Sequence, residues 1–228
     1  MRINKFIAES GACSRREADK LIERGRVTIN GQPAVMGSTA ETGDKVCIDG
    51  RRIAKKKPPI YILLNKPEGI TSTTDRKEPT NIIDYLGYPE RLFTVGRLDK
   101  DSQGIILLTN DGDIVNLILR AENHHEKEYI VTVHRKITNE FLQGMSSGVS
   151  ILDTMTMPCK LTRINDRTFR IVLTQGLNRQ IRRMCEAFGY DVVKLERVRI
   201  MNITIGNLKP GDYRMLTSRE LEQLMSLI

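Results

Sequence analysis

The chain has 228 residues, of which 39% are hydrophobic, and its formal net charge at pH 7 is +8. This length supports one sizeable core together with a small module, and a charged fraction of 28% gives no sign of long-range disorder. No apolar run approaches the roughly 18 residues that span a bilayer, and the first ten residues lack the apolar stretch of a signal peptide, so we expect a cytoplasmic protein with no membrane partner.

The first fifty residues predict two short helices followed by small strands. Apolar residues over 3–7 have the i, i+3, i+4 spacing of an amphipathic helix. A second helix is expected over 14–25, because Ser14 and Glu17 have the spacing of a capping box and a glycine ends the segment. Two later dipeptides predict tight hairpins, Asn30-Gly31 and Asp49-Gly50.

Basic residues concentrate in the same part of the chain. Residues 1–60 hold 13 Lys and Arg against 7 Asp and Glu, which is +6 of the total +8. Two arginines lie at the start of the second helix, where the helix macrodipole disfavours positive charge. Phosphate binding at this helix end would explain them, because both arginines and helix N–H groups bind phosphate. The arrangement over 1–50 resembles the S4 RNA-binding module. By this resemblance four cations on or beside the two helices contact RNA: Lys5, Arg15, Arg16 and Lys20.

A basic stretch over 51–59 ends in two prolines and is expected to be a linker. From residue 60 onward, short β-rich runs alternate with fewer helical segments than a βαβ repeat requires. The pattern predicts an α+β domain over 60–228 with a mixed, mostly antiparallel sheet. Its helical segments are expected at 113–121, 178–189 and 218–228.

The segment 95–113, VGRLDKDSQGIILLTNDGD, places Asp99 and Asp101 just before an apolar run. A calcium loop is excluded, because Asn110 occupies the position of the bidentate glutamate and a strand replaces the second helix. The residues alone leave three readings open. The two carboxylates could hold magnesium in a nucleotidyltransferase, Asp99 could be a single ionised nucleophile, or Asp99 could cap a turn before Gly104.

The remaining chemistry-bearing residues form no further motif. The four cysteines lie far apart without a CxxC pair, and the three histidines add no zinc-ligand spacing. No GxxxxGK[ST] phosphate cradle is present. We therefore expect reduced thiols, no metal site and no cofactor.

Four ordered motifs decide between the readings of the acidic segment. The segment 95–113 resembles the central motif of the RNA pseudouridine synthases, in the branch that carries an N-terminal S4 module. Three more segments resemble motifs of that branch in the same order: LNKPEGITST, KEYIVTV and LTQGLNRQIRRMCEAFGY. The versions DKDSQG and GLNRQIRRM are most similar to synthases that act on large-subunit ribosomal RNA.

The resemblance covers nearly the whole chain and implies both domains and an activity. It implies an S4-like RNA-binding domain over 1–50 and a synthase domain over 60–228. The expected reaction converts a specific uridine of 23S ribosomal RNA to pseudouridine, and a uridine in a tRNA anticodon loop is a further candidate substrate. By the same resemblance, Asp99 is the nucleophile, Tyr129 contacts the uracil and helps to move the C5 proton, and Arg182 pairs with Asp99.

Further residues are assigned to RNA binding by the same resemblance. Arg97 would fill the gap that a flipped base leaves in its stack, and Leu98 and Ile181 would wall the uracil pocket. Arg179 and Arg183 are expected to contact phosphate or to be exposed. Arg179 also marks a departure, since many relatives have histidine at this position.

We expect the synthase to be a monomer. Two other functions compete with the synthase interpretation. The first is a non-catalytic RNA-binding protein of ribosome assembly with an S4 module and a dead synthase fold. The intact set of Asp99, Tyr129 and Arg182 favours the enzyme, because a dead copy has no reason to retain it. The second rival is the magnesium-dependent nucleotidyltransferase.

Overall fold

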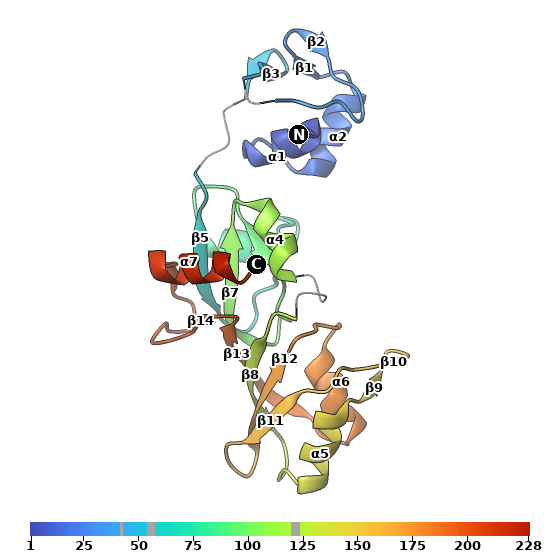
Figure 1. Ribbon diagram of the computed structural model, residues 1–228, viewed down its shortest axis with the longest axis vertical. Helices are drawn as coiled ribbons and strands as arrows, with labels where there is room; N and C mark the ends of the chain where they lie inside the picture. The colour runs from blue at the N-terminus through green and yellow to red at the C-terminus, as the bar shows by residue number, and fades with distance from the viewer. Residues whose placement is uncertain (42, 54–57, 120–123) are drawn as a thin grey trace. The chain divides into compact units, whose positions relative to one another are not determined.

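The computed structural model describes residues 1–41, 43–53, 58–119 and 124–228 (Figure 1). The chain divides into two compact units. The first consists of residues 1–60, 89–91 and 110–112, and the second of residues 61–88, 92–109 and 113–228. Among the described residues no helix is long and apolar enough to cross a bilayer.

The first unit contains two short helices and a small antiparallel sheet. Its elements are α1 (Ile3–Glu9), α2 (Arg15–Glu23), β1 (Val27–Ile29), β2 (Gln32–Pro33), β3 (Val46–Ile48) and β4 (Arg51–Arg52). The predicted capping box is confirmed. The Glu17 N–H donates to Ser14 Oγ at 3.1 Å, and the Ser14 N–H donates to the Glu17 carboxylate at 2.8 Å. These bonds satisfy two of the N–H groups that a helix start leaves without partners.

The sheet of the first unit has the strand order β2-β1-β3-β4. Both predicted hairpin turns are confirmed, with φ of 52° at Asn30 and 51° at Asp49, each followed by a glycine of positive φ. Apolar side chains of both helices and of the sheet form one core beneath them. The expected linker differs at its start, because Arg51–Arg52 pair with β3 as strand β4. Residues 54–57 of that linker lie outside the described residues.

The second unit is built on a nine-stranded sheet. The order along its main path is β11-β12-β8-β13-β7-β5-β15, with β14 paired to β13 and β6 paired to β7. The pairing of β7 with β13 is parallel and every other pairing described in this sheet is antiparallel, so the predicted mixed, mostly antiparallel sheet is confirmed. The strands are β5 (Tyr61–Lys66), β6 (Phe93–Val95), β7 (Gln103–Thr109), β8 (Lys127–Val133), β11 (Lys160–Arg163), β12 (Thr168–Leu173), β13 (Val192–Ile200), β14 (Ile203–Thr204) and β15 (Tyr213–Met215). A separate hairpin is formed by β9 (Ser150–Ile151) and β10 (Thr154–Met155).

Helices accompany the two ends of this sheet, as Figure 1 shows. In that view α5 and α6 lie beside β11 and β12, and α4 and α7 lie beside β5 and β7. Each end has its own hydrophobic core. The helices of this unit are α3 (Ile82–Leu86), α4 (Gly112–Leu119), α5 (Asn139–Ser147), α6 (Gln180–Ala187) and α7 (Ser218–Ser226). The last two residues of the helix expected over 113–121 lie outside the described residues.

The two ends meet where β7 and β13 pair over a short parallel stretch. Gly104 lies opposite Arg197 there, with a φ of 116°. A Cβ atom at this glycine would lie 2.3 Å from the Arg197 carbonyl oxygen. The close approach therefore requires glycine, since neither the conformation nor the contact tolerates a side chain. This junction places the loop before β7 within reach of α6.

Candidate active site

The site begins with the turn that carries Asp99, between β6 and β7. The Ser72 hydroxyl donates to the Leu98 carbonyl oxygen at 2.9 Å and accepts the Leu98 N–H at 3.1 Å. The Ser102 N–H donates to the Asp99 carbonyl oxygen at 3.1 Å. The three residues that make these bonds with the turn are buried: Ser72, Leu98 and Ser102. Buried hydrogen bonds therefore fix the backbone on both sides of Asp99.

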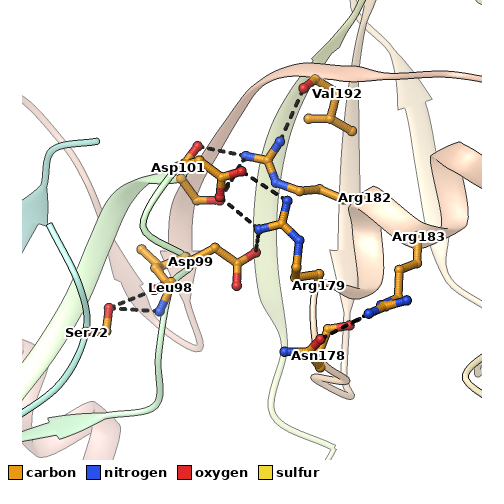
Figure 2. Close-up of polar contacts among 10 residues, drawn as sticks. Ser72, Leu98, Asp99, Asp101, Asn178, Arg179, Arg182, Arg183 and Val192 are labelled. Carbon is orange, nitrogen blue, oxygen red and sulfur yellow. Dashed lines mark hydrogen bonds and ion pairs between the residues drawn. The ribbon is translucent and has the colours of Figure 1, made fainter. Parts of the chain in front are cut away.

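The start of α6 faces this turn, as Figure 2 shows. The Arg179 guanidinium donates to both carboxylate oxygens of Asp101, at 3.1 and 3.0 Å. The same group lies 3.7 Å from Asp99 Oδ2. Arg179 therefore spans the two carboxylates and binds one of them with the two-bond geometry that a guanidinium favours.

Arg182 lies one helical turn further along and reaches the backbone of the turn. Its Nη2 donates to the Asp101 carbonyl oxygen at 2.7 Å and to Ser102 Oγ at 3.2 Å, and its Nη1 donates to the Val192 carbonyl oxygen at 3.2 Å. The expected ion pair between Arg182 and Asp99 is not formed, and Arg179 takes that place. The reason is the helix register, which directs Arg182 to the backbone after Asp99 and leaves Arg179 beside the carboxylate.

The two aspartates of the turn consequently have different surroundings. Hydrogen bonds from Arg179, together with the charge of Arg182, hold the pKa of Asp101 below its ordinary value. Among the described residues the Asp99 carboxylate accepts no hydrogen bond, and its side chain is 31% exposed. Asp101 thus fixes the turn, and Asp99 presents a carboxylate that is free to react.

This arrangement also bears on the magnesium reading of the acidic pair. Both carboxylate oxygens of Asp101 already accept guanidinium N–H groups. To chelate a cation with Asp99, Asp101 would have to give up its two-bond contact with Arg179. Among the residues that the structure describes, no group of three His, Cys, Asp or Glu side chains is placed to hold a metal ion.

A buried lysine lies behind the turn. Lys66 is fully buried at the end of β5, and its ammonium donates to the carbonyl oxygens of Pro67 and Ile70, each at 2.9 Å. Burial lowers the pKa of Lys66 to about 8, although nearby carboxylates, including Asp101 and Asp99, favour its charged form. These bonds give Lys66 a role in shaping the site, because its ammonium holds the backbone at Pro67 and Ile70.

Comparisons with known proteins identify this arrangement. The family model of RNA pseudouridylate synthase matches residues 60–187, and that of the S4 domain matches residues 1–39. A protein of Salmonella typhi, the dual-specificity RNA pseudouridine synthase RluF, is 55% identical over all of this chain and 79% of its own length. The chain belongs to the RNA pseudouridylate synthase family.

Two further relatives support this membership for nearly the full length. Ribosomal large subunit pseudouridine synthase B of Bacillus subtilis is 34% identical over 99% of this chain and 96% of its own. A crystal structure of a pseudouridylate synthase is 31% identical, covers 98% of this chain and has a TM-score of 0.73. The chain is therefore an isomerase that makes pseudouridine in RNA, and the predicted α+β fold with an N-terminal S4 domain is confirmed. The catalytic reading is favoured over the non-catalytic RNA-binding protein.

The other predicted catalytic residue of this synthase is Tyr129, on β8. It lies opposite Arg197 of β13 and Ile171 of β12, and it packs against the core beneath α6. One strand, β13, therefore separates it from β7, which follows the Asp99 turn. The sheet places Tyr129 on the side of the turn where α6 lies.

The residues predicted to bind RNA differ in exposure. Arg97 is exposed, and Leu98 and Ile181 are buried at 7% and 5%. Arg183 donates to the carbonyl oxygen of Asn178 at 3.1 Å rather than to the acidic turn. In the first unit Lys5 is half-buried, 3.6 Å from Glu9, and the three other cations are exposed: Arg15, Arg16 and Lys20.

Sequence reasoning missed three residues that build the site: Ser72, Gln180 and Arg197. Arg197 is 3% exposed, and its Nε donates to the Ile105 carbonyl oxygen at 2.7 Å, across the junction with β7. Ser72 and Gln180 fall inside the motifs LNKPEGITST and GLNRQIRRM, so the motifs themselves were a usable signal. Arg197 lies outside them, in a strand of alternating charged and apolar residues, and gave no signal.

Proposed function

We propose that this synthase isomerises a specific uridine of 23S ribosomal RNA, that it also accepts a tRNA anticodon-loop uridine, and that Asp99 is its nucleophile. The names of two relatives support the choice of substrate, since one is a dual-specificity synthase and the other acts on the large ribosomal subunit. The observation that carries the assignment of Asp99 is the contrast within the turn. Asp101 is bound by two arginines, whereas Asp99 accepts no hydrogen bond among the described residues.

The reaction requires no group beyond the side chains and the RNA. The Asp99 carboxylate adds to the uridine, at the sugar C1′ or at the base C6, and the bond between N1 and C1′ breaks. The uracil turns in the pocket and C5 bonds to C1′. Where the carboxylate had added at C1′, this new bond displaces it, and where it had added at C6, it is eliminated from C6 afterwards. C5 loses its proton and N1 gains one, so that atoms and charge balance.

Four neighbouring residues have proposed roles in this cycle. Tyr129 contacts the uracil face and helps to move the proton from C5. Leu98 and Ile181 wall the pocket, and their burial supports this, because an apolar wall at the base excludes water from the reacting atoms. Arg97, which is exposed, takes the place of the flipped base in its stack.

The division of labour along the chain is part of the same proposal. An S4-like domain, which includes strand β4 and so extends to Arg52, binds RNA through Lys5, Arg15, Arg16 and Lys20. The segment after β4 links it to the catalytic domain over 60–228. Arg179 and Arg183 add positive charge at the active site, where the RNA backbone must pass. We expect a monomeric enzyme in the cytoplasm.

The test uses release of tritium from RNA labelled at C5 of uridine, because each isomerisation frees that hydrogen. The substrates are 23S ribosomal RNA and a tRNA transcript, followed by mapping of the new pseudouridines. We expect release from a single position in each RNA, unchanged in excess EDTA. Failure to modify 23S RNA would contradict the substrate proposal, and loss of activity in EDTA would restore the magnesium reading.

A further inference from the structure

The backbone of Arg179 has a conformation that the surrounding structure must hold in place. Arg179 precedes the first residue of α6 with φ 50° and ψ 35°, in the left-handed region. Residues with a Cβ persist in this conformation only where their neighbours determine it. Its side chain makes no capping bond to the helix, because a guanidinium has no acceptor for a helix N–H, and it donates instead to Asp101, 3.7 Å from Asp99.

The neighbouring side chain, Gln180, closes the loop that leads into this conformation. It is 4% exposed, and its Oε1 accepts the Leu177 N–H at 3.0 Å. Its Nε2 donates to Gln175 Oε1 at 3.3 Å and lies 3.7 Å from Met184 Sδ. Gln175 Oε1 also accepts the N–H of Met157. Both ends of the Gln180 amide are thus used to hold the segment 175–179.

The position of Arg179 depends on this loop. Its guanidinium must lie within hydrogen-bond reach of Asp101 and 3.7 Å from Asp99. A rotation of the backbone at Arg179 out of the left-handed region would redirect the side chain away from both carboxylates. The amide of Gln180 is therefore connected through one residue to the electrostatic surroundings of the proposed nucleophile.

We propose that Gln180 is a positioning residue of the synthase, which holds the loop 175–179 so that Arg179 keeps its place between Asp99 and Asp101. Only the predicted effect of Gln180 on the reaction rate rests on the proposed function. The structural part of the proposal, the control of the Arg179–Asp101 contact, is independent of which RNA is modified. The alternative is that Gln180 contributes only to the stability of the fold. The two hypotheses differ in the pKa that they predict for Asp101 when Gln180 is replaced.

The first measurement needs no RNA. Because Arg179 holds the pKa of Asp101 below its ordinary value, loss of that contact must raise it. We expect carboxyl NMR titration to show this rise in Arg179→Ala and in Gln180→Leu. Gln223→Leu, the same change at an exposed position of α7, should leave the pKa of Asp101 as in the wild type. An unchanged Asp101 pKa in Gln180→Leu would overturn the proposal.

The second measurement is a double-mutant cycle on the single-turnover rate at saturating RNA. Loss of the Gln180 bonds should lower the single-turnover rate about tenfold. In the Arg179→Ala background the same change should have little further effect, because Gln180 acts through Arg179. Equal effects in both backgrounds would show a purely structural role.

Two further variants keep the test decisive. Gln175→Leu removes the acceptor of the Gln180 amide from a partly exposed position, so it provides the same readouts if Gln180→Leu does not fold. Phe141→Leu removes atoms from the hydrophobic core to which Ile181 and Met184 of α6 also belong. This change should leave the pKa of Asp101 unchanged. If Asp99→Asn retained activity, the nucleophile assignment would fail while the Asp101 titration would still decide the role of Gln180.

Discussion

The two units of this synthase hold their functional charges in different ways. In the first unit Arg15, Arg16 and Lys20 are exposed on or beside one short helix. In the second unit the charges around Asp99 come from segments about 80 positions apart in sequence, and Arg179 and Arg182 are each fixed by several bonds. Exposed, locally placed cations suit a partner with many phosphates, whereas a fixed set suits one reacting group.

This comparison predicts two kinds of mutational response. Changes in the first unit should alter RNA affinity gradually and with a dependence on salt, because each cation contributes independently. Changes in the active site should alter the reaction rate sharply, because each residue positions others.

The largest effect is expected for Asp99→Asn. The change keeps the shape of the side chain and removes its nucleophilicity, so turnover should fall at least about 100-fold. RNA affinity and melting temperature should be nearly unchanged, because the Asp99 carboxylate accepts no hydrogen bond among the described residues. Tritium release, filter binding and calorimetry check the three quantities. Residual turnover above about one per cent of the wild type would contradict the assignment.

A smaller effect distinguishes two adjacent arginines of α6. Arg182→Met removes three hydrogen bonds, two to backbone carbonyl oxygens and one to a serine hydroxyl, from a side chain that is 14% exposed. We expect a loss of about 3 kcal/mol in the free energy of unfolding and a more than tenfold lower reaction rate. Arg183→Met is the matched control, because the side-chain hydrogen bonds of Arg183 to described residues go to the exposed Asn178. Denaturant unfolding and single-turnover rates should separate the two variants. Equal losses would show that the contacts of Arg182 are not the cause.

A graded effect is expected from the first unit. Replacing Arg15, Arg16 and Lys20 by glutamine should weaken RNA binding and flatten the slope of log affinity against log salt. Each lost phosphate contact contributes roughly 0.7–0.9 to that slope. The rate at saturating RNA should stay as in the wild type. An unchanged slope in a salt titration would show that these cations are not the RNA anchor.

The smallest effect compares the two capping boxes, one in each unit. Glu220 of α7 closes a box with Thr217 and also binds Arg214 through two bonds of 2.7 Å. The Glu17 carboxylate accepts its described hydrogen bond from Ser14, and the charges of Arg91 and Lys20 near it make a smaller contribution than that bond. Glutamine can replace glutamate in a capping box but not in the Arg214 pair. Glu220→Gln should therefore cost about 1 kcal/mol at pH 7, and Glu17→Gln a few tenths.

The pH dependence of this difference has a definite sign. The hydrogen bonds from Arg214 lower the pKa of Glu220 to about 2. A lowered folded-state pKa adds stability above the unfolded value near 4.5, and this stability is lost as the pH falls toward 2. Melting curves of wild type and Glu220→Gln should separate at pH 7 and converge at acid pH. A constant separation across that range would contradict the ion-pair explanation.

Much of the architecture was predictable because its causes are local. The capping box of α2, the Asn-Gly and Asp-Gly turns and the alternation of short strands each depend on residues a few positions apart, and each appears in the structure. The sequence motifs also indicated the family and pointed to Asp99. The capping box, the turns and the short strands depend on backbone preferences of short segments, so they can be predicted without the tertiary structure.

The tertiary structure decided which groups surround Asp99. The sequence alone placed two candidate arginines in one helix, and only the register of α6 and the left-handed backbone at Arg179 determined that Arg179, and not Arg182, lies beside the carboxylate. The buried Arg197 and the glycine contact at Gly104 likewise exist only because β7 and β13 pair in parallel. Contacts between segments far apart in the chain depend on how the two cores pack, and no local preference records that packing.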